Sequence, residues 1–128
     1  MKLAKVTHKI LLVDDEKAVL DVTTRMLETL GYKVTATSSS LNALDLFSTD
    51  PNQFDLVITD MTMPDMTGDE LARKIMEIRL GMPVILYSGN GQSFTEDIVK
   101  EMGVRKFLQK PATLKNLSET ISKFLEVE

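Results

Sequence analysis

Short apolar segments rich in β-branched residues alternate along the chain with longer segments whose apolar residues recur at helical spacing. The short segments predict β-strands. Three of them show little alternation between apolar and polar residues, as expected for parallel strands that are covered on both faces. The predicted strands are Ile10–Val13, Tyr32–Ala36, Leu56–Thr59, Val84–Tyr87 and Lys106–Leu108.

The segments between and after these strands predict helices, because their apolar residues fall three and four positions apart. Gly31 and Gly81 supply helix ends, and Ser40 and Thr113 are candidate N-caps. The predicted helices are Lys17–Leu30, Ser40–Phe47, Asp69–Arg79, a weaker one at Phe94–Met102, and a last one that follows Thr113 and reaches Leu125.

Five strand-helix units in strict alternation predict an α/β fold, a three-layer sandwich with a five-stranded parallel sheet and helices on both faces. Each crossover should be right-handed. In such sheets ligands bind outside the carboxyl ends of the strands. Functional residues are therefore expected directly after each strand.

Composition narrows the class of protein. The 128 residues are 43% hydrophobic and 27% charged, which fits one folded domain over residues 1–128. A net charge of −4 argues against a direct nucleic-acid partner, and the lack of cysteine excludes disulfides and thiolate chemistry. No apolar run approaches the length of a membrane span, and the first one is too short for a secretory signal. We therefore expect no membrane insertion and a cytoplasmic location.

Polar residues follow four of the predicted strands. Asp14-Asp15-Glu16 follows the first strand, Asp60 the third, Ser88 the fourth and Lys110 the fifth. If the first and third strands are neighbours, three aspartates meet at one edge of the sheet, with a hydroxyl and an ammonium group beside them. At about 5 Å and an effective dielectric of about 20, each ionised pair of carboxylates costs roughly 3 kcal/mol. The cluster must therefore take up a proton, pair with a cation or bind a metal.

Carboxylates without histidine or thiolate favour Mg²⁺ or a similar divalent ion. Such a site suits phosphoryl chemistry, in which the metal and a lysine offset charge on the transferring oxygens while a carboxylate attacks phosphorus. Each feature alone has an ordinary explanation. Asp14-Asp15-Glu16 could be helix N-terminal acids, Asp60 and Ser88 turn residues, and Lys110 a solvated charge. Their shared position at successive strand ends favours one common site.

Four strings of residues, in this order and at these spacings, resemble the receiver domain of two-component response regulators. They are Ile10–Glu16, Asp60 with Met63-Pro64-x-Met66-x-Gly68, Val84–Gly89, and Phe107-Leu108-x-Lys110-Pro111. The resemblance runs from about residue 8 to residue 125. It implies the flavodoxin-like strand order 2-1-3-4-5.

The resemblance also implies a role for each site residue. Asp60 matches the phosphoacceptor, and Asp14 and Asp15 match the acidic pair of the metal site. Mg²⁺ (or Mn²⁺) would be bound by the side chains of Asp15 and Asp60 and by the backbone carbonyl of Thr62, with Asp14 acting through water. By the same resemblance, Lys110 matches the lysine that meets the phosphoryl oxygens, and Ser88 matches the residue whose hydroxyl turns toward the phosphoryl group.

The implied function is signalling rather than catalysis on a separate substrate. A sensor histidine kinase or a histidine phosphotransfer domain would donate a phosphoryl group to Asp60. Ser88 and the aromatic residue Phe107 would then change position and alter the face built by the fourth helix, fifth strand and fifth helix. A downstream protein would bind that face, and phosphorylation could produce a homodimer. The resemblance further implies a cis peptide bond between Lys110 and Pro111.

Three other functions compete with this one. A small Mg²⁺-dependent phosphatase with an aspartyl nucleophile would use the same chemistry, but it needs a second aspartate where Thr62 stands. A flavin-binding protein of the same architecture needs a phosphate-binding loop where Asp14-Asp15-Glu16 would repel the phosphate. A receiver that serves only as a scaffold is disfavoured because every chemical position is filled. Whether the chain acts alone or belongs to a hybrid kinase or a longer regulator stays open, with a slight preference for the hybrid kinase.

Overall fold

The computed structural model describes residues 7–89, 106–110 and 112–125. The strands are β1 (Lys9–Val13), β2 (Lys33–Thr37), β3 (Leu56–Asp60), β4 (Val84–Ser88) and β5 (Lys106–Gln109). The helices are α1 (Lys17–Thr29), α2 (Ser40–Thr49), α3 (Gly68–Ile78) and α5 (Leu114–Phe124). The predicted helix Phe94–Met102, the Lys110–Pro111 peptide bond and the side chain of Phe107 lie outside the described part of the chain.

All the strands pair in parallel, in the order β2-β1-β3-β4-β5. The prediction of an α/β fold with a parallel sheet is confirmed. β1 lies between β2 and β3, with Val13 opposite Thr59, and Asp60 lies opposite Tyr87 on β4. The carboxyl ends of β1, β3 and β4 are therefore level with one another, so residues that follow these strands meet at one edge of the sheet.

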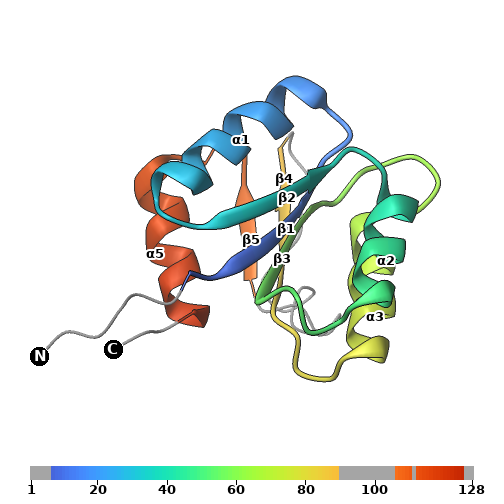
Figure 1. Cartoon of the computed structure of the whole chain (residues 1–128). Helices are drawn as coiled ribbons and strands as arrows, with labels where there is room; N and C mark the ends of the chain where they lie inside the picture. The colour runs from blue at the N-terminus through green and yellow to red at the C-terminus, as the bar shows by residue number, and fades with distance from the viewer. Residues whose placement is uncertain (1–6, 90–105, 111, 126–128) are drawn as a thin grey trace, which may run out of the picture.

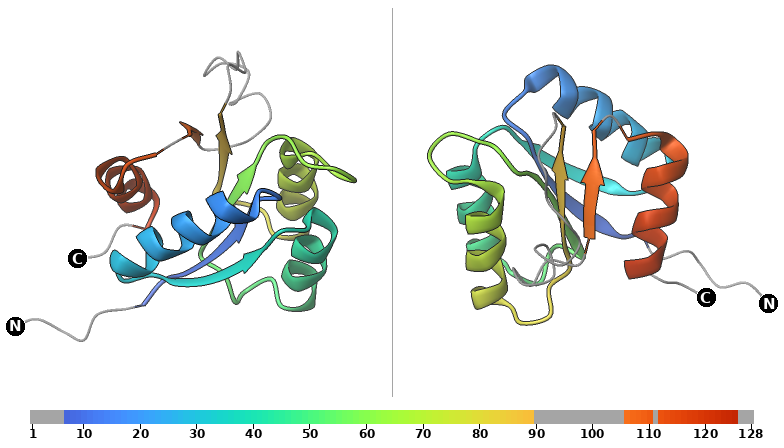
Figure 2. Two further views of the ribbon diagram at one scale, coloured as in Figure 1. Left: turned by 90° about the horizontal axis from the view of Figure 1, so that it is seen from above. Right: turned by 180° about the vertical axis from the view of Figure 1, so that it is seen from behind.

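The helices cover the sheet on both faces, as Figure 1 shows from the front and Figure 2 from above and behind. α1 and α5 pack on one face, where Ile10 and Leu12 of β1 point, and α2 and α3 pack on the other, where Leu11 and Val13 point. Every residue of β3 and β4 is buried. Strands covered on both faces have no polar side to display, which explains the unbroken apolar runs in the sequence.

Helix starts differ slightly from the prediction. Ser39, not Ser40, is the N-cap of α2, and its side chain accepts the backbone N–H of Asn42 at 3.1 Å. Ser40 is buried inside the first turn. Thr113 caps α5 as predicted, accepting the N–H of Asn116 at 3.0 Å. Three consecutive serines, Ser38 to Ser40, offer similar caps in sequence, and the structure assigns the cap to Ser39.

Within the described residues, no helix has the length and apolar composition that crossing a bilayer requires.

Candidate functional site

Asp14 and Asp60 lie at the carboxyl ends of adjacent strands, where the predicted site was expected. Asp60 is the last residue of β3, and Asp14 directly follows β1. Both are nearly inaccessible to solvent, with 1% of Asp14 and 5% of Asp60 exposed. Asp14 is fixed by its backbone N–H, which donates to the carbonyl of Thr37 at 3.2 Å, and by Oδ1, which accepts the N–H of Glu16 at 2.9 Å. Both carboxylates are therefore held by the ends of the sheet.

Asp15 completes a cluster of three carboxylates. One oxygen from each of Asp14, Asp15 and Asp60 lies within 4.8 Å of the other two. Asp15 is exposed, so the cluster opens to solvent on its side. Three hard oxygen donors at this spacing, with one side open to water, fit a Mg²⁺ ion, which keeps several of its waters when it binds to proteins.

Lys110 inserts its ammonium group into this cluster. Nζ lies 2.8 Å from Oδ2 of Asp14, 3.3 Å from Oδ1 of Asp60 and 3.4 Å from Oε1 of Glu16. Its side chain is only 11% exposed. Of the three acids, Glu16 is the exposed one, so its pair with Lys110 contributes little to stability. Lys110 thus supplies the cation that the sequence analysis required for clustered carboxylates.

One lysine does not fully compensate the buried acids. The pKa of Asp60 is raised from 3.8 to about 6: burial is the largest cause, the charge of Lys110 opposes it, and the nearby Asp14 adds to it. For Lys110, burial lowers the pKa, but its contacts with Asp14 and Asp60 outweigh burial and raise it. The carboxylate of Asp60 is therefore destabilised in its charged form, and a second cation would relieve that cost.

The loop after β3 holds Asp60 in place. The backbone N–H of Met61 donates to Oδ1 of Asp60 at 2.9 Å, and the N–H of Gly68 donates to the carbonyl of Met61 at 2.8 Å. A Cβ at Gly68 would lie 2.1 Å from the carbonyl oxygen of Asp60, so only glycine allows this approach. Met63 and Met66 are buried against the α2–α3 side of the core. These two methionines thus anchor the loop to the core.

The other predicted site residues lie at the same edge. Ser88 ends β4 and is buried, and its hydroxyl donates to the carbonyl of Gly89 at 3.3 Å. The backbone of Ser88 also accepts the N–H of Lys110 at 2.9 Å, which joins the ends of β4 and β5. Thr62 is exposed and lines the same cavity as Asp60. The structure therefore brings Asp14, Asp15, Asp60, Thr62, Ser88 and Lys110 to one place.

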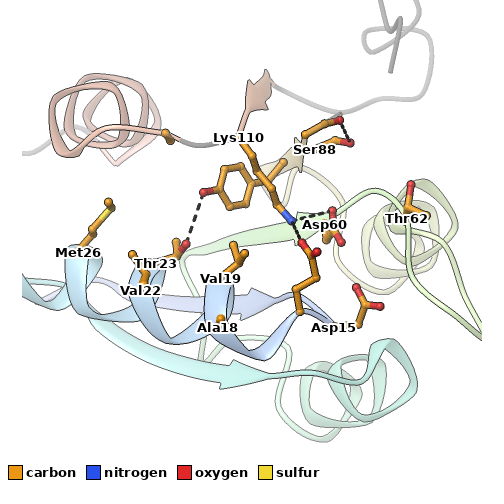
Figure 3. A pocket seen from close by; sticks show the side chains of 14 residues that line it. Asp15, Ala18, Val19, Val22, Thr23, Met26, Asp60, Thr62, Ser88 and Lys110 are labelled. Carbon is orange, nitrogen blue, oxygen red and sulfur yellow. Dashed lines mark hydrogen bonds and ion pairs between the residues drawn. The ribbon is translucent and has the colours of Figure 1, made fainter. Parts of the chain in front are cut away.

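A cavity of about 690 Å³ begins at this cluster and continues along α1. Figure 3 shows Lys110 reaching toward Asp60 at one end, and Val19, Val22 and Met26 following α1 away from it. The acidic end is polar, and the end along α1 is lined by apolar side chains.

Two contacts of Lys110, with Glu16 and Tyr87, and the contact of Tyr87 with Thr23 were not predicted from the sequence. In sequence Glu16 adjoins the acids of the first loop, but in the structure it pairs with Lys110 and does not join the cluster of three. The ring of Tyr87 lies under Lys110 Nζ at 5.2 Å from the ring centroid, and its hydroxyl lies 3.4 Å from Oγ1 of Thr23. An aromatic residue next to Ser88 was visible in the sequence, but its contact with Lys110 depends on how β4, β5 and α1 pack.

The comparisons with known proteins point to a single family. The model of the response regulator receiver domain matches residues 10–122. A receiver domain protein from Clostridium thermocellum has a similar structure, with a TM-score of 0.86 and 36% sequence identity, covering 92% of this chain and 94% of that one.

Two curated relatives are similar in sequence. The two-component response regulator ORR24 of Oryza sativa subsp. indica is 36% identical over 111 residues, which is 85% of this chain and 17% of the relative. The response regulator SaeR of Staphylococcus epidermidis is 32% identical over 111 residues, which is 87% of this chain and 47% of the relative. The chain thus spans less than half the length of these relatives.

Proposed function

The chain belongs to the response regulator receiver domain family, and from that premise we propose that Asp60 accepts a phosphoryl group from a phosphohistidine. Receiver domains are signalling domains rather than enzymes that turn over a separate substrate. The proposed donor is a sensor histidine kinase or a histidine phosphotransfer protein. The proposed readout is a change of conformation that a downstream protein detects.

The position of the Asp60 carboxylate carries this proposal. Asp60 lines the cavity, and its Oδ1 accepts the Met61 N–H at 2.9 Å and lies 3.3 Å from Lys110 Nζ. A nucleophile that is fixed beside a lysine and lines a cavity meets the geometric requirements for attack on an incoming phosphoryl group. Asp14 is not among the residues that line this cavity, and its pair with Lys110 is shorter, at 2.8 Å, so it is less free to act as the nucleophile.

The transfer is an in-line displacement at phosphorus. An oxygen of Asp60 forms a P–O bond as the P–N bond of the donor phosphohistidine breaks, and the electron pair of that bond stays on the imidazole nitrogen. Lys110 lies where it can bind an oxygen of the transferring group, which places its positive charge where negative charge develops. The product is an acyl phosphate on Asp60.

Asp14, Asp15 and Asp60 are the residues proposed to hold a Mg²⁺ ion, with the backbone carbonyl of Thr62 as a further ligand. The spacing of the three carboxylates and the raised pKa of Asp60 support this proposal. When bound, the ion offsets charge on the phosphoryl oxygens. Lys110 would then exchange part of its pairing with these acids for the phosphoryl oxygens.

Ser88 is proposed to respond to phosphorylation. Its hydroxyl now donates to the carbonyl of the next residue at 3.3 Å, a weak and local bond that a phosphoryl oxygen can replace. That exchange would bias the face that the predicted fourth helix, Phe94–Met102, is expected to form with β5 and α5. Phe107 is the proposed aromatic partner in this change, and pairing of two phosphorylated copies through the same face is a further proposal.

The test is phosphorylation by a small phosphodonor. The protein is incubated with acetyl phosphate and Mg²⁺, and intact mass is expected to rise by one phosphoryl group. Asp60→Asn should abolish the gain, whereas Asp65→Asn, an exposed acid in the next loop, should leave it intact. Phosphorylation that persists in Asp60→Asn would show that another residue is the acceptor.

A further inference from the structure

The ring of Tyr87 forms a support under the side chain of Lys110. Nζ of Lys110 lies 5.2 Å from the ring centroid, within the distance at which an ammonium group is attracted to an aromatic face. Tyr87 is 3% exposed, and the Lys110 side chain is 11% exposed, so water screens this contact little. The carboxylates of Asp14 and Asp60 bind the same ammonium group.

The hydroxyl of Tyr87 is tied to α1. It lies 3.4 Å from Oγ1 of Thr23, and Thr23 is 2% exposed. The neighbouring Thr24 donates its hydroxyl to the carbonyl of Leu20, one turn earlier, as threonines in helices commonly do. In the described part of the chain, the partner recorded for the Thr23 hydroxyl is Tyr87 instead. Two buried hydroxyl groups thus satisfy each other between β4 and α1.

The backbone of Lys110 is also held close to β4. Its N–H donates to the carbonyl of Ser88 at 2.9 Å, and a Cβ at Gly89 would lie 3.3 Å from Cβ of Lys110. The base of the side chain is therefore fixed, but four rotatable bonds separate it from the ammonium group. A lysine loses much rotational freedom when its tip is held in one place, so a rigid ring that already holds the ammonium group reduces that cost at the moment of reaction.

We infer that Tyr87, tethered by Thr23, is a positioning residue that holds Lys110 for phosphoryl transfer to Asp60. The inference rests on the proposed function for its kinetic consequence, but the geometry of the contact can be tested without phosphorylation. Its physical basis is a chain of contacts: Thr23 on α1 contacts the Tyr87 hydroxyl, the Tyr87 ring contacts Lys110 Nζ, and Lys110 Nζ contacts Asp60.

The first measurement uses the metal-free protein. Protons of the Lys110 side chain near an aromatic face should have NMR signals shifted upfield by the ring. The shift should persist in Tyr87→Phe, vanish in Tyr87→Leu, and shrink in Thr23→Val, which keeps the volume of residue 23 but removes the tether. The matched control is Tyr32→Phe, because Tyr32 is the other tyrosine of the chain and contacts α5 through Ser122 rather than the site.

The second measurement is the rate of Asp60 phosphorylation by acetyl phosphate. Tyr87→Leu should lower the rate about tenfold, the effect of losing one aromatic contact to a partly desolvated ammonium group. Tyr87→Phe should fall between wild type and Tyr87→Leu. In a Lys110→Met background, Tyr87→Leu should have no further effect, because the group that the ring positions is gone. A general loss of structure would instead lower the rate in both backgrounds.

The outcomes separate the two proposals. If wild type is not phosphorylated on Asp60, the proposed function fails, and the NMR shifts still decide whether Tyr87 holds Lys110. If wild type is phosphorylated and Tyr87→Leu reacts at the same rate, the positioning role is overturned. Should Tyr87→Leu not fold, Thr23→Val serves in its place, and an unchanged Lys110 shift in that variant overturns the tether.

Discussion

Replacing Asp60 by asparagine is expected to make the metal-free protein more stable at neutral pH. The change removes a buried negative charge and keeps an oxygen that can accept the N–H of Met61. Lys110 remains paired with Asp14 at 2.8 Å, so the substitution leaves no buried cation alone. The ionised carboxylate at position 60 is thus kept for function at a cost in stability.

The size of this effect follows from the pKa of Asp60. Burial, with Lys110 opposing and Asp14 adding to it, raises that pKa from 3.8 to about 6 in the folded protein. Between these values the folded state holds a proton that the unfolded state has lost, so stability falls as pH rises. The stability gained from protonating Asp60 in the folded state is fully present below pH 3.8 and is lost as pH rises through about 6. At about 1.4 kcal/mol per pKa unit, the loss is about 3 kcal/mol.

The assay is urea unfolding of wild type and Asp60→Asn in the presence of a metal chelator, at pH 4 and at pH 7.5. The two proteins should have nearly equal free energies of unfolding at pH 4, and the variant should be more stable by up to about 3 kcal/mol at pH 7.5. Asp45→Asn, an exposed acid on α2, is the control and should show no such pH-dependent difference. A variant that is no more stable than wild type at pH 7.5 would refute the reasoning.

Three further predictions concern the close approach at Gly68, the N-cap of α2 and the binding of Mg²⁺. Gly68→Ala should destabilise the protein by about 1–3 kcal/mol in urea unfolding, because the new Cβ would lie 2.1 Å from the carbonyl oxygen of Asp60; an unchanged midpoint would mean that the loop moves without cost. Ser39→Ala should cost about 1 kcal/mol in the same assay through loss of the cap on the Asn42 N–H, and an equal stability would contradict the assignment of this cap. Mg²⁺ should raise the free energy of unfolding, by about 2.7 kcal/mol at a concentration one hundred times its dissociation constant, and Asp15→Asn should weaken this effect; stabilisation of equal size in that variant would exclude Asp15 as a ligand.

The strands and most helices could be predicted from the sequence because their burial leaves a direct pattern. β3 and β4 are buried at every residue and appear as unbroken apolar runs. β2 lies at the edge of the sheet, is largely exposed and has the least regular pattern, so the pattern predicts its start one residue early, at Tyr32 instead of Lys33. α3 starts at Gly68 rather than at Asp69, and Gly68 lies close to the backbone of Asp60. The spacing of apolar residues cannot predict such a contact.

The acids and the lysine of the site could be predicted because they follow strands, and the ends of parallel strands converge. What the sequence could not supply is the set of contacts between elements far apart in the chain. Glu16 and Lys110 are 94 residues apart, and Thr23 and Tyr87 are 64 residues apart. The pairing of their side chains depends on the rotation of α1 over the sheet, which local patterns do not determine.

The central claim is that Asp60 is the residue on which phosphorus is accepted. Its most direct test is to incubate the protein with acetyl phosphate and Mg²⁺, reduce the product with borohydride, and locate the modified residue by tandem mass spectrometry. Reduction converts an aspartyl phosphate into homoserine, and we expect homoserine at position 60 alone. Homoserine at position 14 or 15, or none at any position, would contradict the account.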